Sequence, residues 1–400
     1  MDRYSMSNIY KLDQSAVIMP VFENQYFALF CAFLCERDGF SQPGWLKIDP
    51  LKIHDLSRDL SDGIVLIRLI ESLQGRKYNG KIYENDPTET QKLFNVQIAL
   101  DALKEDGIKT VNIGSNDVVE GNRRSILGLI WCLIQRYQIS SRCKIPPKKL
   151  VLTWLQSAIP EVKLTNLRTN WNDGRALSAL LEYCHPGLCP EWKDLDSKQG
   201  LKNCERAIEL ASRYLGIPSI ISATNLNSPN LDELSCITYL SYFMMKGSCG
   251  YRAALRRVQL ILPHVVIEDF ESSWSDGYLL SLLVEAVGGP VIDFDHMKFG
   301  RFDDYVKNIK IALVAASNIG VESLVKAEDI ADPQGDHLGI MVLATVLCSV
   351  GPQPHFHTAE CFTNQQVNLD FEFANGGEID VDDLTINGLS SIFTNDVIYY

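Results

Sequence analysis

Three short acidic turns recur along the chain, and their residues are the first candidates for chemistry. The turns are Asp62-Gly63, Asp173-Gly174 and Asp276-Gly277. An aspartate before a helix accepts hydrogen bonds from N–H groups of the first turn, and glycine lets the chain reverse tightly. Leu60, Trp171 and Trp274 lie two positions before each aspartate, so we expect them to pack in a core. We therefore interpret all three turns as structural, with a ligand platform at Trp171 as the weaker alternative.

Residues suited to catalysis or metal binding are scarce. The sequence contains no glycine-rich phosphate loop, no HExxH helix and no nucleophile elbow. Two clusters approach metal-ligand spacing, but neither completes a four-ligand zinc pattern. They are Cys184-His185 with Cys189, and His355 and His357 with Cys361. We predict that the protein is not an enzyme and has neither a metal site nor a cofactor.

Composition and charge exclude further classes of function. The 400 residues are 46% hydrophobic and 22% charged, and the formal net charge is −13. This composition predicts folded domains, and the negative charge argues against a nucleic-acid partner. Only segment 45–150 is net basic, with 17 Lys or Arg against 13 Asp or Glu. The search for an acidic partner therefore starts in this segment.

Cysteines and apolar runs bear on the cellular compartment. Eleven cysteines are scattered without a CxxC pair, which is typical of reduced thiols in the cytoplasm. The apolar runs 26–35 and 339–351 are too short to span a bilayer, so we expect no transmembrane segment. We predict a soluble cytoplasmic protein. The sequence contains no segment typical of dimerisation, and its self-association is left open.

The helices that must position the acidic turns recur with a period of about 105 residues. A second repeated residue, at Asn95, Asn203 and Asn308, precedes another helical pattern in each unit. We expect these helices at 96–104, 204–214 and 309–317, and the last helices at 124–137, 234–246 and 338–347. A period this long is typical of complete domains rather than of solenoid repeats. The sequence thus predicts an all-α protein with three consecutive, homologous helical-bundle domains.

Domain boundaries follow from changes in composition. We predict an N-terminal extension with a degenerate first helix at 1–44, the first domain at 45–140, a linker at 141–149, the second domain at 150–246, a short linker at 247–250, a diverged third domain at 251–350, and an acidic tail at 351–400. Pro146-Pro147 makes the first linker stiff. The tail has no Lys or Arg, and its period-two pattern at 367–373 predicts a strand. The tail is either disordered or the truncated start of a β domain.

These motifs resemble calponin-homology (CH) domains. The first domain resembles a first-type CH domain in 59–63, 93–96, 99–100, 121–122 and 126–131. The second is similar to the second-type CH domain of filamins in 152–154, 170–176, 186–190, 215–218 and 231–233. The third is a more diverged copy. Three such domains in series resemble the invertebrate filamin-like proteins of the Jitterbug type, in which filamin-type repeats would follow the tail strand.

The resemblance implies an actin-filament-binding protein of the cytoskeleton. It places the main contact along the last helix of the first domain, reaching back toward Ile113. The implied contact residues are Ile113, Arg123, Arg124, Ile126, Leu129, Ile130 and Leu133. We expect the apolar residues of the helix to divide between the core and a hydrophobic contact. The two arginines would face the acidic filament, or be solvated residues of a helix start.

The resemblance also places an actin-binding segment on the first helix of the second domain, at 150–158, and implies that this domain either contributes to the contact or modulates it. The residues concerned are Lys148, Lys149, Leu150 and Trp154, of which Trp154 is expected in the core. Lys163, Arg168 and Arg175 are candidates for phosphoinositide head groups, or a plain solvated surface. The alternative function is a scaffold that binds other proteins or a phosphoinositide membrane surface instead of actin.

Two segments differ from the family pattern. The stretch 27–34 lacks the Trp-Cys-Asn motif with which relatives open the first domain. The loop 81–92 carries Glu84, Asp86 and Glu89 where filamins carry cations. Because these acids repel an acidic filament, we expect binding to be weaker than in a conventional filamin, or lost. We further expect a two-state clamp, in which the second domain packs against the first and hides part of its filament surface.

Overall fold

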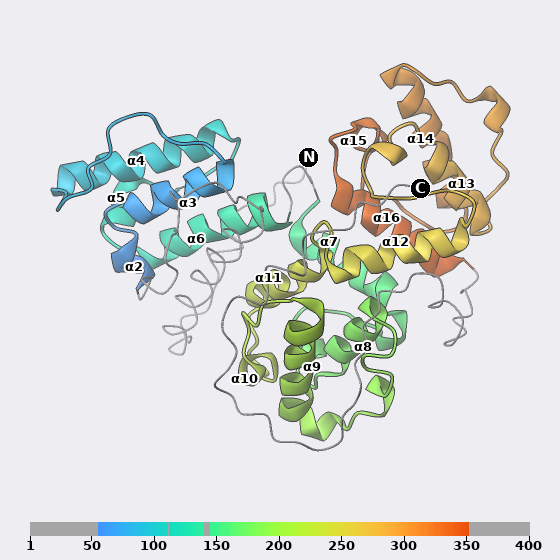
Figure 1. Ribbon diagram of the computed structural model, residues 1–400, viewed down its shortest axis with the longest axis horizontal. Helices are drawn as coiled ribbons and strands as arrows, with labels where there is room; N and C mark the ends of the chain where they lie inside the picture. Colours follow the sequence, from blue (N-terminus) through green and yellow to red (C-terminus); the bar gives the residue numbers. More distant parts are fainter. Residues whose placement is uncertain (1–54, 111, 140–144, 352–400) are drawn as a thin grey trace, which may run out of the picture. The chain divides into compact units, whose positions relative to one another are not determined.

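The computed structural model describes residues 55–110, 112–139 and 145–351 (Figure 1). Within these ranges the chain forms helices joined by turns and contains no strand, so the predicted all-α fold class is confirmed. No helix in these ranges is long and apolar enough to cross a membrane. The N-terminal extension with its degenerate first helix, and the acidic tail with its predicted strand, lie outside the described residues.

One long helix, α4, and the two shorter helices α3 and α6 form the main part of the first domain. Its helices are α2 (Leu56–Asp59), α3 (Ile64–Gln74), α4 (Glu89–Glu105), α5 (Ser115–Val119), α6 (Arg123–Leu133) and the π-helix η3 (Ile134–Ile139). α3 packs against α4, α4 against α5, and α5 against α6. Thr88 starts α4 through a reciprocal capping box with Gln91. The last helix, predicted as regular to 137, changes to a π-helix at Ile134.

The second domain repeats this plan, and its described part begins with the helix α7. Its helices are α7 (Pro147–Ala158), η4 (Pro160–Val162), η5 (Thr169–Trp171), α8 (Arg175–Cys184), η6 (Trp192–Asp194), η7 (Ser197–Gln199), α9 (Gly200–Leu215), α10 (Ala223–Leu226) and α11 (Glu233–Met244). α8 packs against α9, and α7 against α11. α7 begins at Pro147, because a proline at the first helical position gives up no needed N–H group. Three residues of the predicted linker therefore belong to this helix.

The third domain has the same order of elements. Its helices are α12 (Cys249–Ile261), η8 (Ser272–Trp274), α13 (Tyr278–Ala286), η9 (Phe294–His296), α14 (Phe302–Asn318), α15 (Ala327–Ala331) and α16 (His337–Val350). α13 packs against α14, α14 against α15, and α12 against α16. α12 begins inside the segment 247–250 that was predicted as a linker.

The acidic turns have the same geometry in all three domains. The aspartate Oδ1 atoms accept the backbone N–H two residues later, at 2.8 Å for Asp62, 3.0 Å for Asp173 and 2.8 Å for Asp276. The three glycines have φ angles of +76°, +75° and +81°. A Cβ atom on Gly63 would lie 2.7 Å from the backbone nitrogen of Val96, so the turn also needs glycine for close helix approach. Leu60, Trp171 and Trp274 are fully buried, as predicted.

The repeated asparagines join each turn to the next long helix. The side-chain amides of Asn95, Asn203 and Asn308 donate to the backbone oxygen of their domain's turn aspartate at 3.0, 2.9 and 3.0 Å. Each amide also donates, at 2.9 Å, to a backbone oxygen of the segment leading into its helix. These second acceptors are Tyr83, Asp196 and Lys298. Because one buried amide serves two carbonyl groups, the asparagine holds turn, loop and helix in register.

Candidate functional site

The last helix of the first domain begins with exposed positive charge. Arg123 and Arg124 occupy the first two positions of α6, and both are exposed. The side chain of Asn122 caps the helix by accepting the backbone N–H of Ser125 at 3.4 Å. A cation at a helix N-terminus lies at the positive end of the helix dipole, which costs about 0.3–1 kcal/mol. The helix dipole therefore does not favour this pair, and the start of α6 exposes two positive charges at the surface.

The apolar residues expected at a filament contact lie in the core instead. The exposed fraction is 6% for Ile113, 0% for Ile126 and Leu129, 8% for Ile130 and 0% for Leu133. Apolar residues at three- and four-residue steps form one stripe of a helix, and in α6 this stripe is turned inward. The expected division between core and surface contact is thus not found, and among these seven candidates only the two arginines reach solvent.

A polar network fixes the end of the last helix to the rest of the first domain. The hydroxyl of Tyr137 donates to Asp106 Oδ2 at 2.7 Å and accepts from Gln74 Nε2 at 3.2 Å. Arg136 Nη2 pairs with Asp106 Oδ1 at 3.0 Å. Burial and the neighbouring Asp106 raise the pKa of Tyr137, so its hydroxyl stays protonated and keeps donating. The network joins η3 to α3 and to the end of α4.

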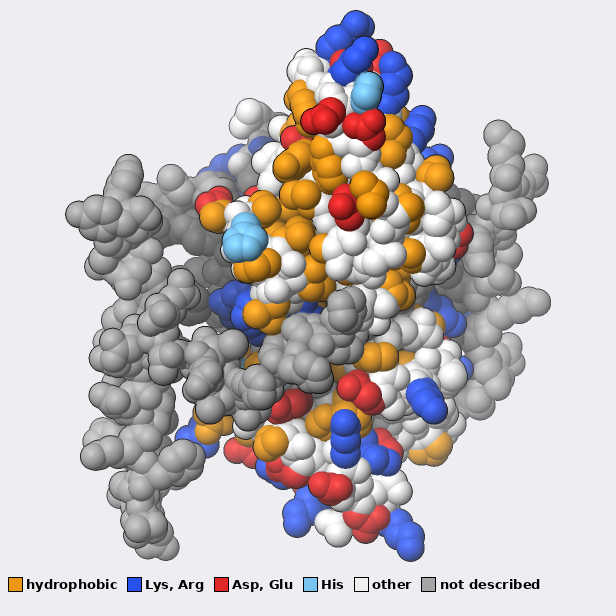
Figure 2. Space-filling model, turned by 90° about the vertical axis from the view of Figure 1, so that its right-hand side faces the viewer, with side chains coloured by type: hydrophobic (Ala, Val, Ile, Leu, Met, Phe, Trp, Pro, Cys, Tyr) orange, Lys and Arg blue, Asp and Glu red, His pale blue; other side chains and the backbone are white. Residues whose placement is uncertain are grey.

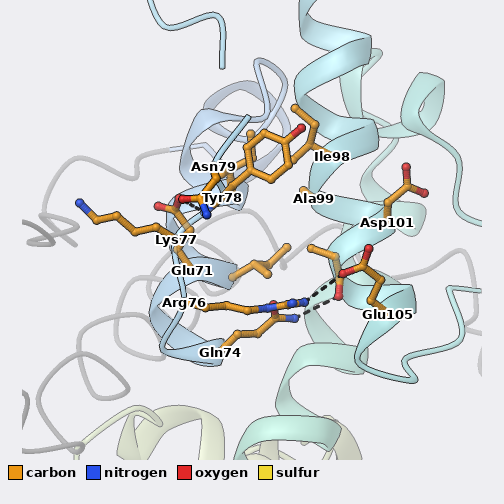
Figure 3. A pocket seen from close by; sticks show the side chains of 13 residues that line it. Glu71, Gln74, Arg76, Lys77, Tyr78, Asn79, Ile98, Ala99, Asp101 and Glu105 are labelled. Carbon is orange, nitrogen blue, oxygen red and sulfur yellow. Dashed lines mark hydrogen bonds and ion pairs between the residues drawn. The ribbon is translucent and has the colours of Figure 1, made fainter. Parts of the chain in front are cut away.

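A cleft of about 320 Å³ lies beside this network, between α3, the following loop and α4 (Figure 3). Glu71 is only 4% exposed; it accepts the backbone N–H of Tyr78 at 2.9 Å and pairs with Arg68 at 2.8 Å. Arg76 donates to Gln74 at 2.9 Å and pairs with Glu105 at 3.2 Å (Figure 3). These contacts stabilise the loop and leave no nucleophile beside a base. Among the described residues, no three His, Cys, Asp or Glu side chains are grouped to hold a metal ion.

Two acids of the acidic loop of the first domain have cations beside them. Glu84 pairs with Arg68, and Glu89 pairs with Lys92 at 2.8 Å. Lys81 lies 4.5 Å from the ring centre of Tyr83. Because two of the acids have a cation beside them, the repulsion of an acidic partner by this loop is smaller than expected.

The first helix of the second domain offers little to an outside partner. Leu150 and Trp154 are fully buried, which agrees with the core assignment of Trp154 and corrects the expected contact through Leu150. Lys148 pairs with Glu233 at 2.9 Å, which connects α7 to α11. Lys149 is exposed and is the remaining candidate on this helix.

The three candidates for phosphoinositide binding differ in exposure. Lys163 and Arg168 are exposed on the segment between α7 and α8. Arg175 is half-buried, and its guanidinium donates to the backbone oxygen of Lys193 at 2.8 Å. On the face in Figure 2, lysines and arginines lie mainly at the top and in the lower part, close to acidic side chains, and hydrophobic and uncharged side chains fill the area between them. Lys163 and Arg168 are therefore the stronger candidates of the three.

One contact between the first and second domains could not be seen in the sequence. Gln138 is 5% exposed, and its side chain donates to the backbone oxygen of Thr238 at 3.1 Å and to Ser241 Oγ at 2.7 Å. These two hydrogen bonds connect the end of the first domain to α11 of the second domain. A single glutamine in a final helical turn is usually solvated, so no pattern in the sequence could have marked it.

Comparisons with known proteins agree with this architecture. The family model described as the calponin homology (CH) domain matches residues 46–139, 145–249 and 256–350. Filamin-C of Rattus norvegicus is 40% identical over 208 residues, which are 50% of this chain and 8% of filamin-C. Filamin-A of Drosophila melanogaster is 39% identical over 211 residues, 50% of this chain and 10% of that protein. The chain thus matches a tenth or less of the length of these relatives. The crystal structure of the actin-crosslinking core of Schizosaccharomyces pombe fimbrin covers 81% of this chain and 74% of its own, with a TM-score of 0.43 and 19% identity.

Proposed function

Because the chain belongs to the calponin-homology family and carries three CH domains in series, we propose that it binds filamentous actin. The similarity of half the chain to filamins, at about 40% identity, supports this function. The observation that supports a contact through the first domain is the positively charged start of α6. It lies in the one net-basic segment of the chain. Such a protein would be located in the cytoplasm at the actin cytoskeleton.

The proposed contact is mainly electrostatic. Arg123 and Arg124 attract an acidic filament surface, and Lys149 adds a charge from the second domain. The buried apolar residues of α6 hold this helix in the domain core and do not contact the filament. An interface of exposed charges weakens as salt screens it, so the affinity should fall with ionic strength.

Co-sedimentation of the full chain with filamentous actin tests the proposal. We expect pelleting that weakens across a salt series. The Arg123→Ala/Arg124→Ala variant should bind about three- to ten-fold more weakly, because each exposed charge pair contributes up to about 1 kcal/mol. Lys198→Ala/Lys202→Ala removes two exposed cations from the second domain and is the matched control. Equal weakening of both variants would contradict the contact at α6, and no pelleting by folded protein would contradict actin binding.

We also propose that the second domain restrains the first through the Gln138 contact. The buried bonds from Gln138 to Thr238 and Ser241 favour a closed state, so the apparent affinity is reduced by the closed fraction. Gln138→Ala should therefore raise actin affinity by about two- to ten-fold. Gln156→Ala, which removes an amide bond to Leu164 within the second domain, is the control. Unchanged affinity in Gln138→Ala would contradict the clamp.

The alternative function is binding to a phosphoinositide membrane surface or to other proteins. The exposure of Lys163 and Arg168 favours lipid binding as a second activity. Vesicles that contain a phosphatidylinositol bisphosphate test it, with neutral vesicles as the control. We expect Lys163→Ala/Arg168→Ala to lose binding while Arg175→Ala, whose guanidinium is engaged with Lys193, changes it less.

A further inference from the structure

The last helix of the third domain is buried on every side. Ten of the fourteen residues of α16 are buried, and the helix contains no Asp, Glu, Lys or Arg. Its own domain covers it through α12 and α13. A helix that is apolar all round needs neighbours on its remaining side as well. α7 of the second domain supplies that neighbour, because α16 packs along it.

The first helix of the third domain, α12, belongs to the same interface between the second and third domains, which we call the seam. α12 packs against α8 and α11 of the second domain. Arg256 Nη2 donates to the backbone oxygen of Cys184, at the end of α8, at 2.6 Å. The guanidinium of Arg257 lies 5.3 Å from the ring centre of Tyr183. These two contacts bind consecutive arginines of the third domain to consecutive residues of the second.

A glycine allows the closest approach in this seam. A Cβ atom on Gly250 would lie 2.7 Å from the ring of Trp154 on α7 and 2.5 Å from the backbone oxygen of Phe243. Trp154 also makes an edge-to-face contact with Tyr183, with ring centres 6.3 Å apart. Tryptophan, tyrosine and arginine thus stack in series from α7 through α8 to α12. The seam is packed like a domain interior rather than like a loose contact between neighbours.

We propose that the third CH domain is the intramolecular partner of α7 and α8, and that it covers the first helix of the second domain. This helix is the segment that the family resemblance assigned to actin contact. Here α16 packs along it and Gly250 of α12 lies against its Trp154, so its exposed residues are Lys148, Lys149 and Gln156. The third domain acts as a cover that decides whether α7 takes part in binding.

Hydrogen exchange of the full chain tests the cover without any ligand. Arg256→Ala/Arg257→Ala removes both charged contacts, and we expect exchange in α7 and α16 to become about ten-fold faster. Exchange in α4 of the first domain should stay unchanged. Tyr183→Phe is the matched control within the seam, because it keeps the ring face and removes only a buried hydroxyl that has no hydrogen-bond partner among the described residues.

A second control separates the seam from cation–π contacts in general. Arg213 lies 5.7 Å from the ring centre of the exposed Tyr214, also in the second domain. Arg213→Ala should leave α7 exchange as in the wild type. Should the double variant unfold as a whole, Arg256→Ala alone removes only the hydrogen bond to Cys184 and gives the same comparison. Unchanged exchange in α7, or equal acceleration in α4 and α7, would overturn the proposal.

Actin pelleting then shows what the cover controls. Stronger pelleting by the seam variant than by the wild type means that α7 contributes to binding once it is uncovered. Pelleting equal to the wild type, with faster exchange in α7, means that the cover is real and that α7 is not an actin contact, which restricts binding to the first domain. Because exchange is measured without actin, failure of the cover and failure of actin binding give different results.

Discussion

The helices α6 and α16 close the first and third domains in the same position, yet they meet different surroundings. α6 begins with two exposed arginines and buries one apolar stripe. α16 carries no charged Asp, Glu, Lys or Arg side chain and is buried on ten of its fourteen residues. The core of the fold is common to both domains. The outer face of the last helix therefore differs between the domains: in α16 it packs on α7 of the neighbouring domain, and in α6 it carries the two exposed arginines of the proposed contact.

Substitution of a core leucine in either helix should have the largest effect on stability, and the domains affected should differ between α6 and α16. Leu133 of α6 and Leu347 of α16 are both fully buried, so Leu→Ala at either site should cost about 2–5 kcal/mol. Leu133→Ala should destabilise the first domain. Leu347→Ala should destabilise the second and third domains together, because α16 also packs on α7. Denaturant unfolding followed by hydrogen exchange in each domain measures this. Loss of the third domain alone would show that the two domains are not coupled.

Substitutions in the shared turn network should affect the first and third domains alike. Asn95→Ala and Asn308→Ala each remove a buried amide that serves two backbone carbonyls. We expect a loss of about 2 kcal/mol in the affected domain, because the carbonyls keep no replacement donor. Urea unfolding of each variant gives the free energy of unfolding. A cost confined to one of the two domains would mean that the network is not equivalent in the repeats.

The smallest effect should be a difference at alkaline pH. Burial raises the pKa of the Cys348 thiol on α16 to about 12, and it also raises the pKa of Cys132 on α6. In the unfolded chain a thiol loses its proton near pH 9, so the unfolded state is favoured as pH rises from 9 toward 12. Cys348→Ala should reduce this loss of stability in the third domain. Below pH 9 it should change the dependence of stability on pH very little. Thermal unfolding across pH measures it, and an identical alkaline slope in variant and wild type would contradict the assignment.

Much of the fold could be predicted because the same signals occur three times. The Asp-Gly turns and the large residues before them mark each domain, and Leu60, Trp171 and Trp274 are all core residues. The starts of the long helices were placed too late. α4 begins at Glu89 and α14 at Phe302, since their first turns are polar and show no apolar period. Capping, as at Thr88, starts α4 where periodicity gives no signal.

The surface was harder to predict than the core. Periodicity identifies apolar residues, but it does not say which neighbour covers them. The four apolar candidates on α6 were therefore expected to divide between core and contact, whereas all four are buried. Arg256 and Arg257 resemble solvated charges on an amphipathic helix, and only the fold brings them to α8. One signal was available: a helix without a charged residue, such as α16, must be covered from both sides.

The most direct test of the account is a hydrogen-exchange footprint of the full chain on filamentous actin. We predict slower exchange at the start of α6, around Arg123 and Arg124, and no change in α16 or in α7 beyond its first turn, which carries Lys149. The Arg123→Ala/Arg124→Ala variant should lose the protection at α6. Protection centred on α7 in the wild-type chain, with none at α6, would contradict both the filament contact on the first domain and the cover formed by the third.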